Sequence, residues 1–254
     1  MPRSTSSRAK RIASIRGAAA WVDRVGLAAL FPTDDLVLPS LWEAVTGKPV
    51  VDRDFAPDVA LVWGWKDELP GQKLVCAGKH LGGRASFVSL ELLPVLYALT
   101  GRSGQPADFR DEELSPVELD VAEALLESGP VSSAELPSVA GHERKRVSAA
   151  AARLQRRLVV TSAGRQEHDQ GWPSVVFDIL PRRYGDSLAA LPESDDARAT
   201  LAWTILRAAG EVSAADVAAV IGGTRKQAAA ALERLAAEGK ARQRDMGEYL
   251  LWAL

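Results

Sequence analysis

The chain has 254 residues, of which 47% are hydrophobic and 25% are charged, and its formal net charge is −2 at pH 7. Such a chain can bury a sizeable core, in one large domain or in two to three small ones. It contains no run of about 18 apolar residues, and its polar, basic N-terminus lacks the apolar core of a secretory signal. We therefore expect a cytoplasmic protein without a membrane partner.

Metal and disulfide chemistry is not indicated. The single cysteine, Cys76, excludes an intramolecular disulfide, and a buried place on a strand is its expected role. The three histidines lie far apart, beside no second cysteine or paired carboxylates. Because a structural zinc ion needs four clustered ligands, we expect no metal, and no motif indicates a cofactor.

The charges are unevenly distributed along the chain. Residues 105–128 hold eight acids and one arginine, a net charge of −7, whereas residues 143–157 hold six bases and one acid, a net charge of +5. Local basic clusters on a nearly neutral chain indicate an anionic partner, although the solvated face of a helix is the commoner explanation. A further five bases without an acid lie near the N-terminus: Arg3, Arg8, Lys10, Arg11 and Arg16.

The first hundred residues predict three helices, a hairpin and a fourth helix. The hairpin is expected to turn at Gly82-Gly83, where glycine supplies the required backbone freedom. Trp63 and Trp65 cannot share one helix face, so one of them is expected to be exposed or in a groove. The predicted elements are helices over 15–26, 38–46, 57–69 and 89–99, and strands over 73–79 and 84–88.

The rest of the chain contains an internal repeat. A shift of 81 residues aligns Gly129–Leu154 with Gly210–Leu235 without a gap, with twelve identities in 26 positions that include a Gly-x-Val-Ser-x-Ala frame. Each copy reads as a helix, a short helix, a longer helix and then a hairpin. In the middle copy the two strands of the hairpin are expected over 158–162 and 174–180. Caps mark several helix starts: Ser115 with Glu118, Ser213 with Asp216, and Thr224 with Gln227.

This order of elements is typical of a winged helix. We therefore predict a mainly α protein with small β-hairpins, of the α+β class, built from tandem winged-helix domains. The predicted domains are a divergent N-terminal one over 1–104, a middle one over 105–183 and a C-terminal one over 184–254.

In winged-helix DNA binders the N-terminal half of the third helix enters the major groove. Arginine can bond guanine, glutamine can pair with adenine, and lysine or arginine can neutralise phosphate. The alternative is that these side chains form only the solvent faces of amphipathic helices. The candidate DNA-binding residues are Arg144, Lys145, Arg146, Arg153, Arg157, Arg165, Thr224, Arg225, Lys226, Gln227, Arg242 and Arg244.

The stretch LPESDDARATLAWTILRAAGEVSAADVAAVIGGTRKQAAAALERL, together with RVGLAAL near the N-terminus, resembles the AlkZ/YcaQ family of bacterial DNA glycosylases. The resemblance implies tandem winged helices arranged around duplex DNA. In that family a Gln-x-Gln or Gln-x-Asp motif after an Arg-hydrophobic-Gly sequence supplies catalysis. The matching positions here are Ala29, Leu30 and Phe31, which carry no polar group. Asp34 and Asp35 are possible substitutes, although a capping or turn role fits them better.

Three functions remain open from the sequence. The first is a DNA-binding protein that is related to repair glycosylases but has lost catalysis. The second is an active glycosylase for alkylated or bulky bases that uses other residues. The third is a winged-helix module that binds a protein partner, or a transcriptional regulator, since the acidic segment around Asp111 would repel DNA.

Overall fold

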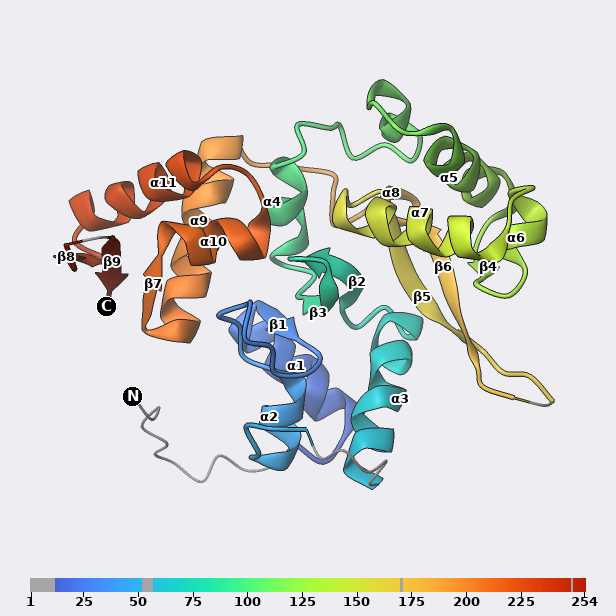
Figure 1. Ribbon diagram of the computed structural model, residues 1–254, viewed down its shortest axis with the longest axis horizontal. Helices are drawn as coiled ribbons and strands as arrows, with labels where there is room; N and C mark the ends of the chain where they lie inside the picture. The colour runs from blue at the N-terminus through green and yellow to red at the C-terminus, as the bar shows by residue number, and fades with distance from the viewer. Residues whose placement is uncertain (1–11, 52–56, 170, 248) are drawn as a thin grey trace.

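Helices and small antiparallel sheets alternate along the chain in the computed structural model, which describes residues 12–51, 57–169, 171–247 and 249–254. Within these residues there are three sheets of three strands each, so the predicted α+β class is confirmed. Residues 194–254 lie on one side of the molecule and residues 116–183 on the other, with the first sheet between them (Figure 1).

The first unit begins with a helix that Ser14 caps through its side chain. Helix α2 starts at Leu41 and not at Leu38 as predicted, because Leu38 precedes Pro39 and proline disfavours a helical conformation in the residue before it. The strand predicted from Lys73 begins only at Cys76, since Lys73 has a positive φ of 54°. The elements are α1 Ile15–Val25, β1 Leu27–Ala29, α2 Leu41–Thr46, α3 Pro57–Gly71, β2 Cys76–Leu81, β3 Arg84–Val88 and α4 Leu93–Ala98.

The middle unit contains the capping box predicted at Ser115 and Glu118. The first strand of its hairpin continues to Gln166, beyond the predicted end at Ser162, because a register shift between Ser162 and Gly164 lets the strand keep its pairing. The elements are η1 Asp108–Asp111, α5 Pro116–Ser128, β4 Val131–Ser132, α6 Leu136–Val139, α7 Arg144–Arg156, β5 Val160–Gln166, β6 Ser174–Ile179 and α8 Leu180–Arg183.

The last unit repeats this order. Capping boxes at Ser213 with Asp216 and at Thr224 with Gln227 start its second and third helices, as predicted. The elements are α9 Ser194–Ala209, β7 Glu211–Ser213, α10 Ala214–Ile221, α11 Arg225–Ala237, β8 Arg242–Asp245 and β9 Leu250–Ala253.

All three sheets share one strand order, in which a short strand after the first helix pairs with the last strand of the unit. The orders are β1-β3-β2, β4-β6-β5 and β7-β9-β8. The sequence predicted only a two-stranded hairpin in each unit. This prediction was wrong, because β1, β4 and β7 each add a third strand. These strands have two or three residues each, too few for a period-2 pattern to reveal them.

The first sheet is apolar on both faces. The pair Ala28 and Phe87 packs into a core with α1, α2 and α3, whereas the neighbouring pair Leu27 and Val88 packs into a second core that includes α9 and α11. Helix α4 also packs against α9. The first and last units therefore share one apolar core, whereas α5 and α7 close a separate core in the middle unit. The predicted division into three domains remains a prediction.

Candidate nucleic-acid interface

The first turn of α7 presents three consecutive basic side chains to solvent. Arg144, Lys145 and Arg146 are exposed, and the next residue, Val147, is buried in the middle unit's core. None of these three basic side chains forms an ion pair with a described residue. Because the N-terminal turn of a helix also carries a partial positive charge and unpaired backbone N–H groups, this end of α7 attracts anions.

The first turn of α11 carries the equivalent group. Arg225 and Lys226 are exposed and form no ion pair within the described part of the chain. Thr224 is the cap, and the Oε1 atom of Gln227 accepts hydrogen bonds from the Thr224 backbone N–H at 2.9 Å and from its hydroxyl at 3.1 Å. These bonds fix the amide of Gln227 at the helix start and leave its Nε2 group without a described partner.

Four of the other predicted DNA-binding residues are tied to carboxylates. Arg153 donates to Glu118 at 2.7 Å, Arg157 donates to Glu112 at 2.7 Å, and Arg165 lies 2.6 Å from Glu167. Arg244 donates to Glu211 at 2.8 Å. Arg242 is exposed and has no ion pair with the described residues. The basic side chains at the starts of α7 and α11 therefore have no carboxylate partner among the described residues, whereas Arg153, Arg157, Arg165 and Arg244 each pair with a carboxylate.

Of the basic N-terminal cluster, Arg16 is exposed, and Arg3, Arg8, Lys10 and Arg11 lie outside the described residues.

The acidic segment 105–128 is largely engaged within the middle unit. Asp108 is buried and accepts hydrogen bonds from the Tyr97 hydroxyl and the Gly104 backbone N–H, both at 2.8 Å. Partial burial acts to raise the pKa of Glu118, but hydrogen bonds from Ser115 and Arg153 outweigh this effect and lower it. Further ion pairs are Arg102 with Asp108 and Glu112, and Arg110 with Glu123. Much of the repulsion that this segment would exert on DNA is therefore neutralised.

The positions that match the glycosylase motif lie in the protein interior. Ala29 and Leu30 are each 1% exposed. Phe31 is half-buried, with its ring centroid 6.0 Å from that of Trp42 and 6.1 Å from that of Trp63. A hydrocarbon side chain can neither position a water molecule nor offset positive charge on a sugar. These three residues therefore cannot supply base excision.

The two aspartates considered as substitutes have different surroundings. Asp35 accepts hydrogen bonds from the guanidinium of Arg84, at 3.0 Å from its Nε atom, and from the hydroxyl of Thr33. The bond from Arg84, followed by that from Thr33, lowers the pKa of Asp35. Asp35 is thus engaged in an ion pair with Arg84 and in a local hydrogen bond with Thr33. Asp34 is exposed and borders a cleft of about 610 Å³ with Glu43 and Val50.

Glu43 is a carboxylate near the motif position that the sequence analysis missed. The backbone brings it there, because the Trp42 N–H donates to the Leu30 carbonyl at 3.1 Å and the Ala29 N–H donates to the Pro39 carbonyl at 2.9 Å. Its side chain accepts a hydrogen bond from the Ser40 hydroxyl at 2.7 Å, which completes a cap on α2. The spacing Ser-x-x-Glu in SLWE is the sequence signal that could have pointed to it.

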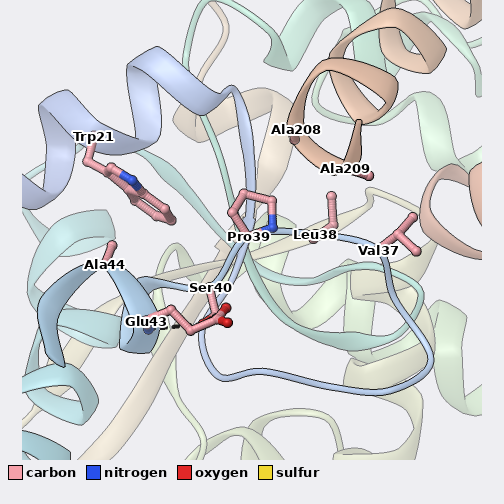
Figure 2. Close-up of a pocket in the computed structure, with 9 residues that line it drawn as sticks. All are labelled: Trp21, Val37, Leu38, Pro39, Ser40, Glu43, Ala44, Ala208 and Ala209. Carbon is pink, nitrogen blue, oxygen red and sulfur yellow. Dashed lines mark hydrogen bonds between the residues drawn. The ribbon is translucent and has the colours of Figure 1, made fainter. Parts of the chain in front are cut away.

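Glu43 borders a second cleft, of about 360 Å³, between the first and last units. Figure 2 shows Glu43 beside Ser40, with Trp21 of α1 on one side and Ala208 and Ala209 of α9 on another. One carboxylate oxygen of Glu43 accepts a hydrogen bond from Ser40, and the lining residues of this cleft include no second acidic or basic side chain. This arrangement fits capping better than base excision.

A comparison with models of known protein families shows to which family the chain belongs. Residues 12–222 match the family described as AlkZ related. The chain belongs to the AlkZ-related family. The match covers all of the first two units and the first part of the last one, up to the turn before α11.

The solved structures support the same fold. The DNA glycosylase AlkZ of Streptomyces sahachiroi superposes with a TM-score of 0.56 over 93% of this chain, at 14% sequence identity. The chain spans 64% of the length of that AlkZ chain. A search of curated proteins gave no significant match.

Two further observations concern other kinds of site. Among the residues that the structure describes, no helix has both the length and the hydropathy to cross a membrane. In the same part of the chain, no three His, Cys, Asp or Glu side chains gather as a metal-binding group.

Proposed function

We propose that this AlkZ-related protein binds duplex DNA through tandem winged helices and does not excise bases. The first turns of α7 and α11 are the proposed contacts with DNA, through Arg144, Lys145 and Arg146 in one unit and Arg225 and Lys226 in the other. Gln227 is proposed to add a contact through its Nε2 group. Arg153, Arg157, Arg165 and Arg244 are proposed to support the units and to contact DNA less, since each is already paired with a carboxylate.

One observation carries the proposal. At the same place in two repeated units, neighbouring bases without described partners stand at a helix N-terminus, above a buried face that fixes the helix. A solvated helix needs no such repetition at one turn. The family and the resemblance of the fold to a DNA glycosylase point in the same direction.

The lack of excision is proposed from the motif position. By resemblance, Ala29 and Phe31 stand where the AlkZ/YcaQ motif carries its polar residues; Ala29 is buried, and the half-buried Phe31 packs against the core. Loss of one preorganised electrostatic group typically costs a hundredfold or more in rate. An active glycosylase that uses Glu43 or Asp34 is the second candidate, because both side chains border one cleft.

Equilibrium binding to a labelled duplex tests the proposal. We expect Arg144→Glu with Lys145→Glu to weaken binding at least tenfold without lowering the melting temperature by more than a few degrees, because both side chains are exposed. Arg156→Glu is the matched control for Arg144→Glu alone, since each reverses one exposed charge, at opposite ends of α7. Equal losses in both variants would show a nonspecific charge effect and would contradict the proposed orientation of α7.

A further inference from the structure

A cleft of about 470 Å³ lies between α3 of the first unit and the wing strands of the middle unit. Its lining includes two tryptophans and three charged side chains: Trp63, Lys66, Asp67, Arg165 and Trp172. It is separate from the first turns of α7 and α11, and none of its residues belongs to the motif position. Arg165 is also a candidate for contact with duplex DNA, but neither the proposed duplex contacts nor the glycosylase motif accounts for Trp63, Lys66, Asp67 and Trp172.

The two indoles are unusually open to solvent. Trp63 is 45% exposed and Trp172 is 75% exposed. Large aromatic side chains gain free energy from burial, so two exposed indoles bordering one cleft indicate a surface that a ligand covers. Phe31 stacks against Trp63 with ring planes 22° from parallel, which braces this indole from the protein side.

Charged groups accompany the indoles. The Lys66 ammonium lies 5.3 Å from the Trp63 ring centroid and pairs with Asp67, and it keeps further N–H donors beyond that pair. Arg165 pairs with Glu167 through its Nε atom at 2.6 Å and lies 4.0 Å from Glu68 through one terminal nitrogen, which leaves the N–H donors of its other terminal nitrogen. The cleft therefore combines flat apolar walls with cationic donors.

Asp67 adds an acceptor at the cleft. The residue is 6% exposed, and burial, only partly offset by Lys66, raises the pKa of its carboxyl group. A buried carboxyl group favours a partner that hydrogen-bonds to it. The amino and ring N–H groups along the edge of a nucleobase are such partners.

Glycines lie at the wall of the cleft and at the contact between its two sides. Gly64, on α3, leaves the cleft wall without a side chain, and a methyl group there would lie 3.8 Å from a nitrogen of Arg165. A methyl group at Gly164 would lie 3.1 Å from the Cα atom of Gly71, so α3 and β5 approach backbone to backbone. This close approach fixes the two walls relative to each other.

We infer that this cleft binds an unpaired nucleobase of a DNA strand. The base stacks on an indole, Asp67 accepts a hydrogen bond from the base edge, and Lys66 and Arg165 receive the adjoining phosphate. Stacking of bases on aromatic side chains together with cationic contacts to the backbone is the general mode of single-strand binding. The inference rests on the proposed function only for the choice of DNA as the polymer.

Tryptophan fluorescence with an oligothymidylate of about ten nucleotides tests the inference, because strands of this length fill such sites. A strand of equal length with abasic residues keeps the phosphates and removes the bases. We expect the thymidylate to quench the fluorescence and to bind at least tenfold more tightly than the abasic strand. Equal binding of the two strands would overturn the inference.

Single substitutions test whether the thymidylate binds at this cleft. Trp172→Ala should weaken thymidylate binding about tenfold, the typical loss for one base stack, and its exposure makes a folding defect improbable. Tyr249→Ala removes another exposed aromatic residue, in the last unit, and should change nothing. Unchanged binding in Trp172→Ala would contradict the inference. Arg144→Glu with Lys145→Glu should reduce duplex binding and spare the thymidylate, so a failure of the cleft and a failure of the duplex surface give different results.

Discussion

Phe31 stacks on Trp63 with ring centroids 6.1 Å apart, at the position where the AlkZ/YcaQ motif would end in a polar residue. The same ring also lies 6.0 Å from Trp42. The backbone of this segment is held by two hydrogen bonds, from the Ala29 N–H to the Pro39 carbonyl and from the Trp42 N–H to the Leu30 carbonyl. The side chains of Ala29, Leu30 and Phe31 therefore serve packing here.

Restoring the motif should therefore cost stability without creating a glycosylase. Ala29→Gln would place an amide at a site that is 1% exposed, and Phe31→Gln would remove two ring contacts. We expect the double variant to lose about 2–4 kcal/mol of unfolding free energy in urea titrations, from polar burial and overpacking. Phe31→Leu, which loses mainly the ring contacts, should lose about 1 kcal/mol. Base release by the double variant would contradict this explanation.

The natural sequence should release no base from duplexes that contain N3- or N7-methylated purines. The motif position supplies no group for water activation or charge stabilisation. Product analysis against the spontaneous rate of depurination measures this directly. If base release is found, Glu43→Gln, Asp34→Asn and Asp35→Asn identify the acid responsible, and loss of activity in one of them with folding intact would make this protein an enzyme.

Gly82 lies at the junction between the first and last units, where its backbone contacts α10 directly. Its N–H donates to the Val220 carbonyl at 3.0 Å, and its φ of 54° favours glycine. A methyl group there would lie 2.5 Å from Leu36 and 2.9 Å from the Ala219 carbonyl oxygen. We expect Gly82→Ala to lower the free energy of unfolding by about 2 kcal/mol or more. Gly47→Ala is the matched control, with a similar φ of 69° and no atom within 4 Å of the added methyl, and should cost less.

A buried histidine at the other junction should make stability depend on pH. The His80 Nδ1–H donates to the Gln155 carbonyl at 2.8 Å, and burial lowers the pKa of His80 despite this bond. Below about pH 6.5 the unfolded chain protonates this histidine before the folded chain does, so stability falls as the pH falls, by at most about 1.4 kcal/mol per pH unit. Denaturation between pH 7.5 and about 5.5 should show this slope reduced in His80→Gln. An unchanged slope would assign the pH dependence to other groups.

Local signals in the sequence were sufficient for most helices. Capping boxes at Ser115, Ser213 and Thr224 are satisfied where they were predicted, because they depend on residues within one turn. The prediction that either Trp63 or Trp65 would be exposed is also confirmed, since Trp65 is 5% exposed and Trp63 is 45% exposed. Cys76 is buried on β2, as expected.

Features that depend on distant residues could not be predicted in this way. Strands β1, β4 and β7 form only through pairing with strands about 40 to 60 residues later, and the sequence of two or three residues carries no such information. Arg153 pairs with Glu118, which lies 35 positions away in the sequence. The sequence of the basic cluster therefore could not show which of its side chains form ion pairs. Glu43 and the cleft between α3 and the middle wing are likewise products of tertiary packing.

The salt dependence of duplex binding tests the central claim most directly. Each phosphate contact releases counterions and contributes about −0.9 to the slope of log binding constant against log salt. We expect the natural protein to bind a duplex with micromolar affinity or better at about 50 mM salt and with a slope of about −3 or steeper. Arg225→Glu with Lys226→Glu should make the slope shallower by about 2. Absent binding at low salt, or binding that does not respond to salt, would contradict the claim and favour a protein partner.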